Sequence, residues 1–290
     1  MERLRPGRHG CRRRGRCDAG LRTVSPAPDP TTVEPMSAQT VLLTAAEQAE
    51  AATATGKYWH VRKLQKRAIH MLRNGQDYWL VSQQVNEQWA RPDGQTWMGS
   101  RGLDSVPMSA KDGVAWRKDG KPNGERLPAR LEKDSGTDAF LLCDKGMSLK
   151  QVQALPTDPA ALKNTLSRML PPEKPVPGSL SRDQLVQGCL TDLLSHLPAQ
   201  PKVRAAAYRV LAAMPGVTVG GKVTDERGRK GVEVRTKGRG GTADKMIIDT
   251  RSSLVLVTSR TVPGIPGVPA GQVYLQVGWT DAGPKVPALP

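Results

Sequence analysis

Two spacings of apolar residues divide the chain into helical and extended segments. A period of 3.6 residues predicts a helix over residues 37–55, which are rich in alanine, and further helices in the middle of the chain. A period of two predicts strands before and after these central helices. The expected strands lie around residues 59–61, 79–85, 217–223, 232–235, 245–249, 254–262 and 272–279.

Capping and turn residues mark the ends of several of these segments. Asp158 followed by a proline begins one central helix, and Ser181 with Gln184 in capping-box spacing begins the next. A third central helix begins at Pro201. Residues 89–97 contain a Pro-Asp-Gly turn between two extended runs, and this arrangement predicts an antiparallel hairpin.

The order of the segments predicts an α+β fold, because strands separated by turns flank a central group of helices and no βαβ alternation is present. We expect one or more curved antiparallel sheets, packed by the N-terminal helix and a central group of about three helices. The expected parts are a disordered basic and proline-rich leader over 1–35 and a single domain over 36–290, with a tryptophan-rich sheet half over about 36–146, central helices over about 147–215 and a strand meander over about 216–280.

The composition is that of a globular protein. The chain has 290 residues, of which 38% are hydrophobic and 24% charged, and its mean hydropathy is −0.46. No run approaches the roughly 20 apolar residues of a bilayer-spanning helix. Arg12–Arg14 resembles the start of a signal peptide, but no apolar segment follows it. We therefore expect neither an export signal nor a membrane span within this sequence.

A strong positive charge indicates the kinds of partner that the chain could attract. There are 43 basic and 27 acidic side chains, which gives a formal net charge of +16. Such a balance favours nucleic acid, another polyanion or an anionic membrane surface. Residues 237–241, a short basic and glycine-rich segment, fit an RNA- or phosphate-contacting loop, with a flexible hairpin tip as the alternative.

The cysteines and histidines do not form a recognisable site. Four cysteines, at positions 11, 17, 143 and 189, show no legible disulfide framework. The spacing of Cys11 and Cys17 fits no zinc pattern, so we expect no metal and no cofactor. His196 lies at the end of a predicted helix, where an imidazolium would interact favourably with the helix dipole.

Motifs of catalysis are also missing from the pattern. The spacing Gly216-x4-Gly221-Lys222 is that of a phosphate-binding loop, but a helix precedes it, a strand follows it, and Val223 stands where a hydroxyl is needed. No nucleophile, base and orienting group can be assigned from the sequence. We therefore expect a protein that is not an enzyme.

Four segments resemble an uncharacterised actinobacterial family whose members typically have one transmembrane anchor and an extracytoplasmic domain. Residues 155–162 resemble its Leu-Pro-x-Asp-Pro-x-x-Leu element, and residues 193–217 are similar to its two-helix segment. Residues 225–232 resemble the following hairpin, and residues 247–249 the start of an Asp-Pro-x-Thr-Gly turn. The order of helix and sheet is also similar to the half-barrel of lipoprotein carriers and sigma-factor regulators, in which a curved sheet holds an acyl chain or a peptide.

These observations lead to two functional hypotheses. The first is a non-enzymatic ligand- or peptide-binding or sensing domain, associated with the cell envelope, in which Trp59, Trp79, Trp89 and Trp97 contact an apolar ligand or an envelope peptide. Their alternation with other apolar residues is also that of a buried face, so the alternative role of these tryptophans is plain core. The second hypothesis is a basic protein that binds nucleic acid or another polyanion.

Overall fold

The computed structural model describes residues 37–290, apart from residues 54, 123–126, 135, 137, 173–178, 238–241 and 262–269. Its helices are α1 (Ala38–Ala51), α2 (Ala110–Lys118), α3 (Leu149–Gln153), α4 (Pro159–Met169), α5 (Arg182–His196) and α6 (Pro201–Ala213). Its strands are β1 (Tyr58–Arg73), β2 (Gln76–Ala90), β3 (Thr96–Pro107), β4 (Arg130–Asp134), β5 (Phe140–Leu142), β6 (Lys145–Met147), β7 (Thr218–Thr224), β8 (Lys230–Lys237), β9 (Ala243–Asp249), β10 (Leu254–Thr261) and β11 (Ala270–Thr280). The predicted leader over 1–35 lies outside the described residues.

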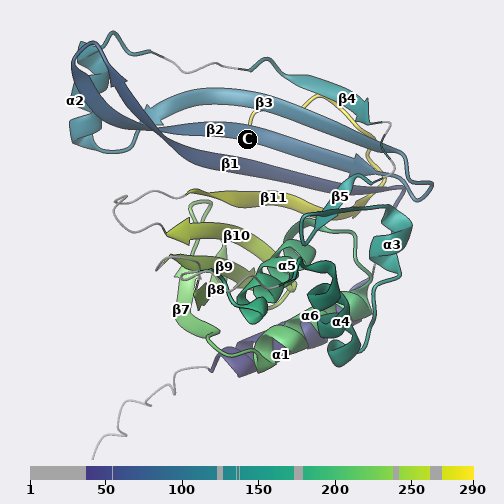
Figure 1. Ribbon diagram of the computed structural model, residues 1–290. Helices are drawn as coiled ribbons and strands as arrows, with labels where there is room; N and C mark the ends of the chain where they lie inside the picture. Colours follow the sequence, from purple (N-terminus) through teal and green to yellow (C-terminus); the bar gives the residue numbers. More distant parts are fainter. Residues whose placement is uncertain are drawn as a thin grey trace, which may run out of the picture. The chain divides into compact units, whose positions relative to one another are not determined.

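One antiparallel sheet contains nine of these strands. Its order is β4-β3-β2-β1-β11-β10-β9-β8-β7. The first and last strands of the sequence, β1 and β11, therefore pair at its centre. The long strands β1, β2 and β3 bow across the upper part of Figure 1, and the central helices lie below them against β8–β11. The predicted α+β class, with an antiparallel sheet, an N-terminal helix and central helices, is confirmed.

The helices begin where side-chain caps satisfy their first backbone amides. Ser37 accepts from the amide of Thr40 at the start of α1, and Asp158 accepts from the amide of Ala161 at the start of α4. Ser181 opens α5 in a full capping box, as the sequence predicts. The apolar faces of α1, α4, α5 and α6 then pack into one core with the sheet, and that core defines the helix-side face of the sheet.

The hairpin of β1 and β2 is longer than the sequence pattern indicated. Asn74 and Gly75 both have positive φ, 50° and 69°, which are the angles of a two-residue hairpin turn of type I′.

Helix α2, which follows β3 in the sequence, packs against β2, although the sequence pattern did not predict this helix. Asp119 ends α2, and its buried carboxylate accepts from the hydroxyl of Tyr78 at 2.6 Å and the amide of Asn74 at 2.5 Å.

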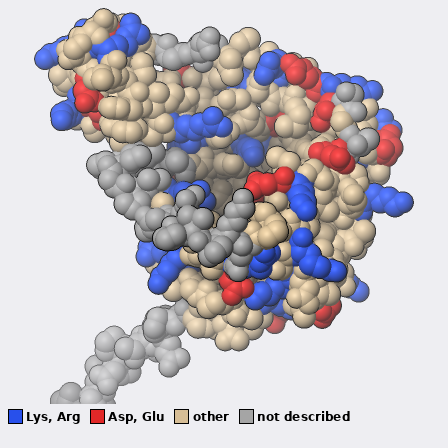
Figure 2. Space-filling view, viewed as in Figure 1, with Lys and Arg blue, Asp and Glu red and all other residues tan. Residues whose placement is uncertain are grey.

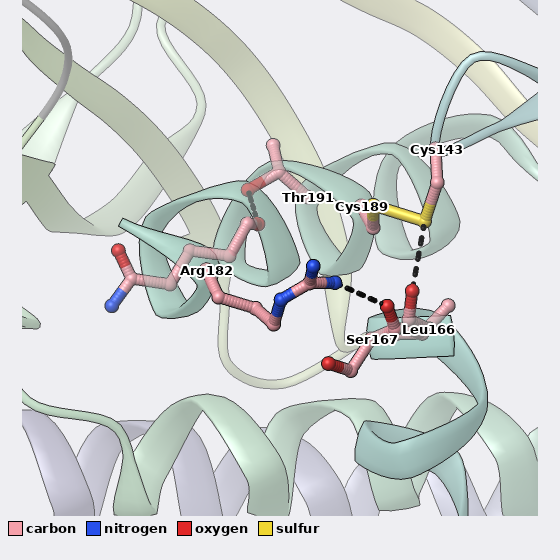
Figure 3. The surroundings of a disulfide bond; sticks show 7 residues. Cys143, Leu166, Ser167, Arg182, Cys189 and Thr191 are labelled. Atoms are coloured by element: carbon pink, nitrogen blue, oxygen red, sulfur yellow. Dashed lines mark hydrogen bonds between the residues drawn. A yellow bond between two sulfur atoms is a disulfide. The ribbon is translucent and has the colours of Figure 1, made fainter. Parts of the chain in front are cut away.

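A disulfide bond ties the sheet connections to the helices. Cys143, in the turn between β5 and β6, is bonded to Cys189 of α5 across 46 residues of sequence (Figure 3). The spacing of the cysteines in the sequence predicted no disulfide bond. The structure corrects this prediction, because it pairs two cysteines that are each isolated in the sequence. Arg182, at the start of α5, donates to the carbonyl of Ser167 at 2.6 Å and so fixes the other end of the helix to α4.

The last residues of the chain cross the face of the sheet opposite the helices. Arg62 of β1 donates to the carbonyls of Ala288 and Leu289 at 2.8 and 2.9 Å, and Arg101 of β3 donates to that of Pro287 at 2.5 Å. We call residues 281–290 the C-terminal strap. No helix of the described part of the chain is long and apolar enough to cross a membrane.

Candidate functional site

A cavity of about 390 Å³ lies between α5 and the helix-side face of the sheet. Strands β8 to β11 form its floor, while α5 and α6 contribute its wall. Figure 2 shows this side of the molecule hollowed between the long strands and the helices, with Lys and Arg side chains around the hollow. The lining residues are Gly188, Thr191, Asp192, Leu211, Val234, Thr236, Asp244, Lys245, Met246, Thr258, Ser259, Arg260, Gly271 and Gln272.

Helix α5 presents Asp192 to this cavity because its opposite face is held in the core. Leu190, Leu193 and Leu194 are fully buried, and Cys189 is fixed by the disulfide. Asp192 lines the cavity and is exposed to solvent. The acidic residue beside three buried leucines therefore lies at the solvent-accessible wall of the cavity.

Register places Lys63 of β1 beside the same cavity. Lys63 pairs with Tyr274 of β11, and the next residues on that face, Gln65 and the cavity-lining Gln272, pair with each other. Trp59 and Val61, which precede Lys63 on alternate positions of β1, both pack in the helix-side core. Lys63 is thus a half-buried lysine on the core-facing side of a central strand.

The environments of Asp192 and Lys63 disfavour their charged forms. Loss of hydration raises the pKa of Asp192 to about 6; the charges of Lys63 and Arg260 oppose this rise, and Asp144 adds to it. Burial lowers the pKa of Lys63, and the attraction of Asp192 opposes that shift. The two charged groups influence each other, yet they form no ion pair within 4.0 Å.

The other charged side chains of the cavity are already paired. Arg260 donates to both carboxylate oxygens of Asp244, at 2.6 and 3.1 Å. Lys245 lies 2.9 Å from Glu233, which also pairs with Arg235. Lys63, Asp192 and the neighbouring Asp144, by contrast, make no side-chain ion pair within the described part of the chain.

His196 is neutral in this environment. Burial, together with the positive charge of Lys63, lowers its pKa to about 3. Desolvation therefore opposes the imidazolium that the sequence placed at the end of α5. The nearby Ser195 hydroxyl lies 3.0 Å from Nδ1 of His196, but Ser195 is only 1% exposed, so a ligand in the cavity does not reach it.

A strip of side-chain amides continues the helix-side face from the cavity onto β1 and β2. Gln84 donates to Asn86 at 2.8 Å, and Asn86 donates to Gln65 at 3.1 Å. Gln88, on the same face, donates to the carbonyl of Ala139 at 2.9 Å. The strip therefore offers hydrogen-bond donors and acceptors rather than apolar contact area.

The four tryptophans predicted as ligand contacts do not gather at one place. Trp59 lies on the helix-side face, buried, and its Nε1 donates to the carbonyl of His196 at 3.1 Å. Trp89 and Trp97 pair on the opposite face, where both make edge contacts with Tyr58. Trp79 lies far along the β1–β2 hairpin, where it stacks on a histidine. None of the four lines the cavity.

Sequence reasoning missed Asp192, which lines the cavity, and Lys63, which lies on the same side of the sheet. A signal was present for Lys63, because it follows Trp59 and Val61 at the spacing of one strand face, where a lysine is unusual. Asp192 carried a weaker signal, an acidic residue beside the leucine stripe of α5. The basic segment 237–241 begins at the end of β8, and its remaining residues lie outside the described part of the chain.

No group of three or more histidine, cysteine, aspartate or glutamate residues in the described ranges is arranged to hold a metal ion. Comparison with known proteins finds no matching family model, no matching curated protein and no matching solved structure. The argument for function therefore rests on the cavity and its side chains.

Proposed function

We propose that this protein is a non-enzymatic ligand- or peptide-binding domain, and that the ligand occupies the cavity between α5 and strands β8–β11. The observation that carries the proposal is the cavity itself, whose volume of about 390 Å³ lies within the roughly 300–1,000 Å³ of small-ligand sites. Its lining mixes apolar residues such as Leu211 and Met246 with polar groups from four strands and a helix.

The chemistry of the lining favours a peptide or another polar ligand over an acyl chain. An acyl chain offers no hydrogen-bonding group to the polar residues that line the cavity, and removing polar groups from water without a new partner costs binding free energy. A peptide carries a hydrogen-bonding amide at every residue. The amide strip of Gln65, Gln84 and Asn86 can pair with such groups beyond the cavity.

The disulfide supports an envelope location. Bonds such as Cys143–Cys189 form and persist in oxidising compartments and are rare in the reducing cytosol of mesophiles. An extracytoplasmic sensing role, and the similarity to lipoprotein-carrier and sigma-factor-regulator half-barrels, agree with this location and form part of the proposal. The basic surface leaves polyanion binding as the competing function.

A variant that fills the cavity tests the proposal. Gly188 of α5 lines the cavity, and a Cβ added there would meet no atom within 4 Å, so Gly188→Leu should fold normally and occupy the space. Gln48→Leu, on the exposed side of α1, is the matched control. Binding is measured by calorimetry, with intrinsic tryptophan fluorescence as a second readout, for a panel of short peptides, acyl lipids and heparin.

The outcomes separate the candidates. Peptide binding that Gly188→Leu abolishes and Gln48→Leu preserves supports the cavity as the site. Binding of acyl lipids with the same dependence keeps the site but overturns the preference for a polar ligand. Heparin binding that falls steeply with salt and ignores Gly188→Leu would favour the polyanion function, and no binding of any probe would refute the proposed function.

A further inference from the structure

The C-terminal strap has the residue pattern of a polyproline II helix. Its prolines stand at positions 284, 287 and 290, a spacing of three. A polyproline II helix has about three residues per turn, so prolines at this spacing share one side of it. Pro287 is buried, whereas the side chains of Val286 and Leu289 are 47% and 60% exposed. The strap, the yellow end of the chain that passes β4 and β3 in Figure 1, therefore packs through its central proline.

Gly99 of β3 makes room for that proline. A Cβ added at Gly99 would lie 2.8 Å from Cγ and 3.0 Å from Cδ of Pro287, so the proline ring occupies the space that a side chain would fill. Leu131 of β4 borders this space, with its Cδ1 3.5 Å from the same Cβ position. A glycine inside a strand often marks a place where another backbone approaches closely. The sheet thus has a notch that fits a proline ring.

Two arginines bind the carbonyls of the strap. Arg101 of β3 donates to the carbonyl of Pro287 at 2.5 Å. Arg62 of β1 donates to the carbonyls of Ala288 and Leu289 at 2.8 and 2.9 Å. A polyproline II segment leaves its carbonyls available for such contacts because it has no internal hydrogen bonds. These contacts read backbone groups and one proline ring, so another segment with a proline in the same register can make them.

A buried network of the sheet holds Arg62 in position. Its Nε lies 3.1 Å from one carboxylate oxygen of Glu87, a side chain that is 2% exposed. The other oxygen of Glu87 lies 2.8 Å from Nε2 of His60, whose ring stacks on Trp89 with the centroids 3.5 Å apart. The guanidinium of Arg62 is thus oriented by the sheet and not by the strap. The surface beneath the strap is therefore preorganised for an extended segment.

The strap itself is held by few contacts. Among the described residues, no backbone–backbone hydrogen bond joins residues 281–290 to the sheet. Beyond residue 282, its attachment consists mainly of the hydrogen bonds from the two arginines and the buried ring of Pro287. A segment with so little buried apolar surface opens at a small cost in free energy. Another segment of the same chemistry can therefore compete for this surface.

We propose that the surface of β1–β3 beneath the strap recognises an extended segment of a partner protein with prolines at a spacing of three, and that the strap occupies this surface as an exchangeable intramolecular ligand. A proline of the partner enters the notch at Gly99, while Arg62 and Arg101 bind the carbonyls at and after it. Proline-rich segments suit such a surface because their extended conformation loses little entropy on binding. The surface lies on the face of the sheet opposite the cavity, so the inference goes beyond the proposed function and does not depend on it.

A labelled peptide tests this surface in the full-length chain. The probe is an acetylated and amidated peptide with the sequence of residues 283–290 and a fluorescein label, and binding is measured by fluorescence anisotropy. The strap variant carries Pro284→Gly, Pro287→Gly and Pro290→Gly, which removes the ring from the notch. It should bind the probe at least about tenfold more tightly than the wild-type protein, in which the docked strap competes. A control peptide with glycine in place of every proline should bind the strap variant at least about tenfold more weakly than the probe, because its backbone loses more entropy on binding.

Substitutions in the sheet of the strap variant assign the contacts. Gly99→Ala fills the notch and should abolish binding of the probe. Arg101→Gln removes a charged hydrogen-bond donor and should weaken the probe by about tenfold. The controls are Met98→Ala and Arg130→Gln, which change neighbouring residues on the other face of β3 and β4 and should leave the affinity unchanged. Gly188→Leu alters the cavity alone and should also leave it unchanged.

The remaining outcomes would overturn the inference. They are no binding of the probe by the strap variant, equal binding of the probe and the control peptide, and equal affinity of the strap variant and the wild-type protein. Dimerisation of the wild-type protein that the strap variant loses would assign the surface to a second copy of the chain and not to a separate partner. Matching melting curves of all variants exclude a folding defect as the cause of lost binding. Probe binding that Gly188→Leu abolishes would place the peptide in the cavity, which overturns this inference and leaves the proposed function standing.

Discussion

The disulfide between Cys143 and Cys189 should supply a large part of the stability of this fold. It closes a loop over a sequence separation of 46 residues. Loop-closure entropy for that length destabilises the unfolded state by about 4 kcal/mol at 25 °C. In a domain of this size, 4 kcal/mol corresponds to a shift of roughly 8–16 °C in the melting temperature. The bond also joins the β5–β6 hairpin to α5, whose apolar residues share one core with those of the hairpin.

Guanidinium denaturation of the oxidised and the reduced protein measures this contribution without a mutation. The denaturation midpoint should fall on reduction, and the double variant Cys143→Ala with Cys189→Ala should show the same loss and no further response to reductant. Cys11→Ala with Cys17→Ala is the control, since those cysteines take no part in the bond. Equal midpoints for the oxidised and reduced protein, with free thiols shown by titration in the reduced sample, would refute the reasoning.

Three further perturbations have defined outcomes. Asp192→Asn should raise the melting temperature at pH 7.5 and leave it nearly unchanged at pH 3.5. The reason is that desolvation raises the pKa of Asp192 to about 6, so the folded state loses stability as the pH rises through that value. An equal effect of the substitution at both pH values would contradict this. Gly99→Ala places a Cβ 2.8 Å from Cγ of Pro287, so hydrogen exchange in the C-terminal strap should accelerate, and unchanged exchange would show that the strap tolerates the contact. Arg229→Gln leaves the buried carboxylate of Asp225 without its cation and should cost about 2 kcal/mol in urea denaturation, with no loss if backbone amides alone suffice.

The sequence predicted α4, α5 and α6 well because each begins with a capping residue or a proline in its first turn. Ser181 and Gln184 form the capping box that their spacing indicates, and Asp158 caps α4. Helix α2 also has a capping residue, Ser109, which accepts from the amide of Asp112, but it has no apolar stripe, since Gly113 is its only buried residue in the described structure. It is held instead by tertiary hydrogen bonds to β2, and the residues that make those bonds are distant in sequence.

The candidate site was harder to predict because its parts meet only in the folded chain. A hydrophobic pattern identifies which face of β1 packs inward, but it does not place Lys63 opposite a helix that follows more than a hundred residues later. The tryptophans dominated the sequence pattern, yet Trp89 lies on the other face of the sheet from Trp59. The alternation of apolar residues determines which side chains share a face within one hairpin. The packing of the helices determines which face of the sheet borders a cavity.

Helix α5 connects the covalent and the chemical parts of the structure. The disulfide at Cys189 and the hydrogen bonds of Arg182 to α4 hold it at two points, and Asp192 projects from its remaining free face. A wall held in this way loses little conformational entropy when a ligand binds, so the binding free energy is not spent on ordering the site. For the proposed ligand site, selectivity then depends on the side chains that the fixed wall and floor present. Such a wall favours recognition by a preformed surface over closure of the protein around the ligand.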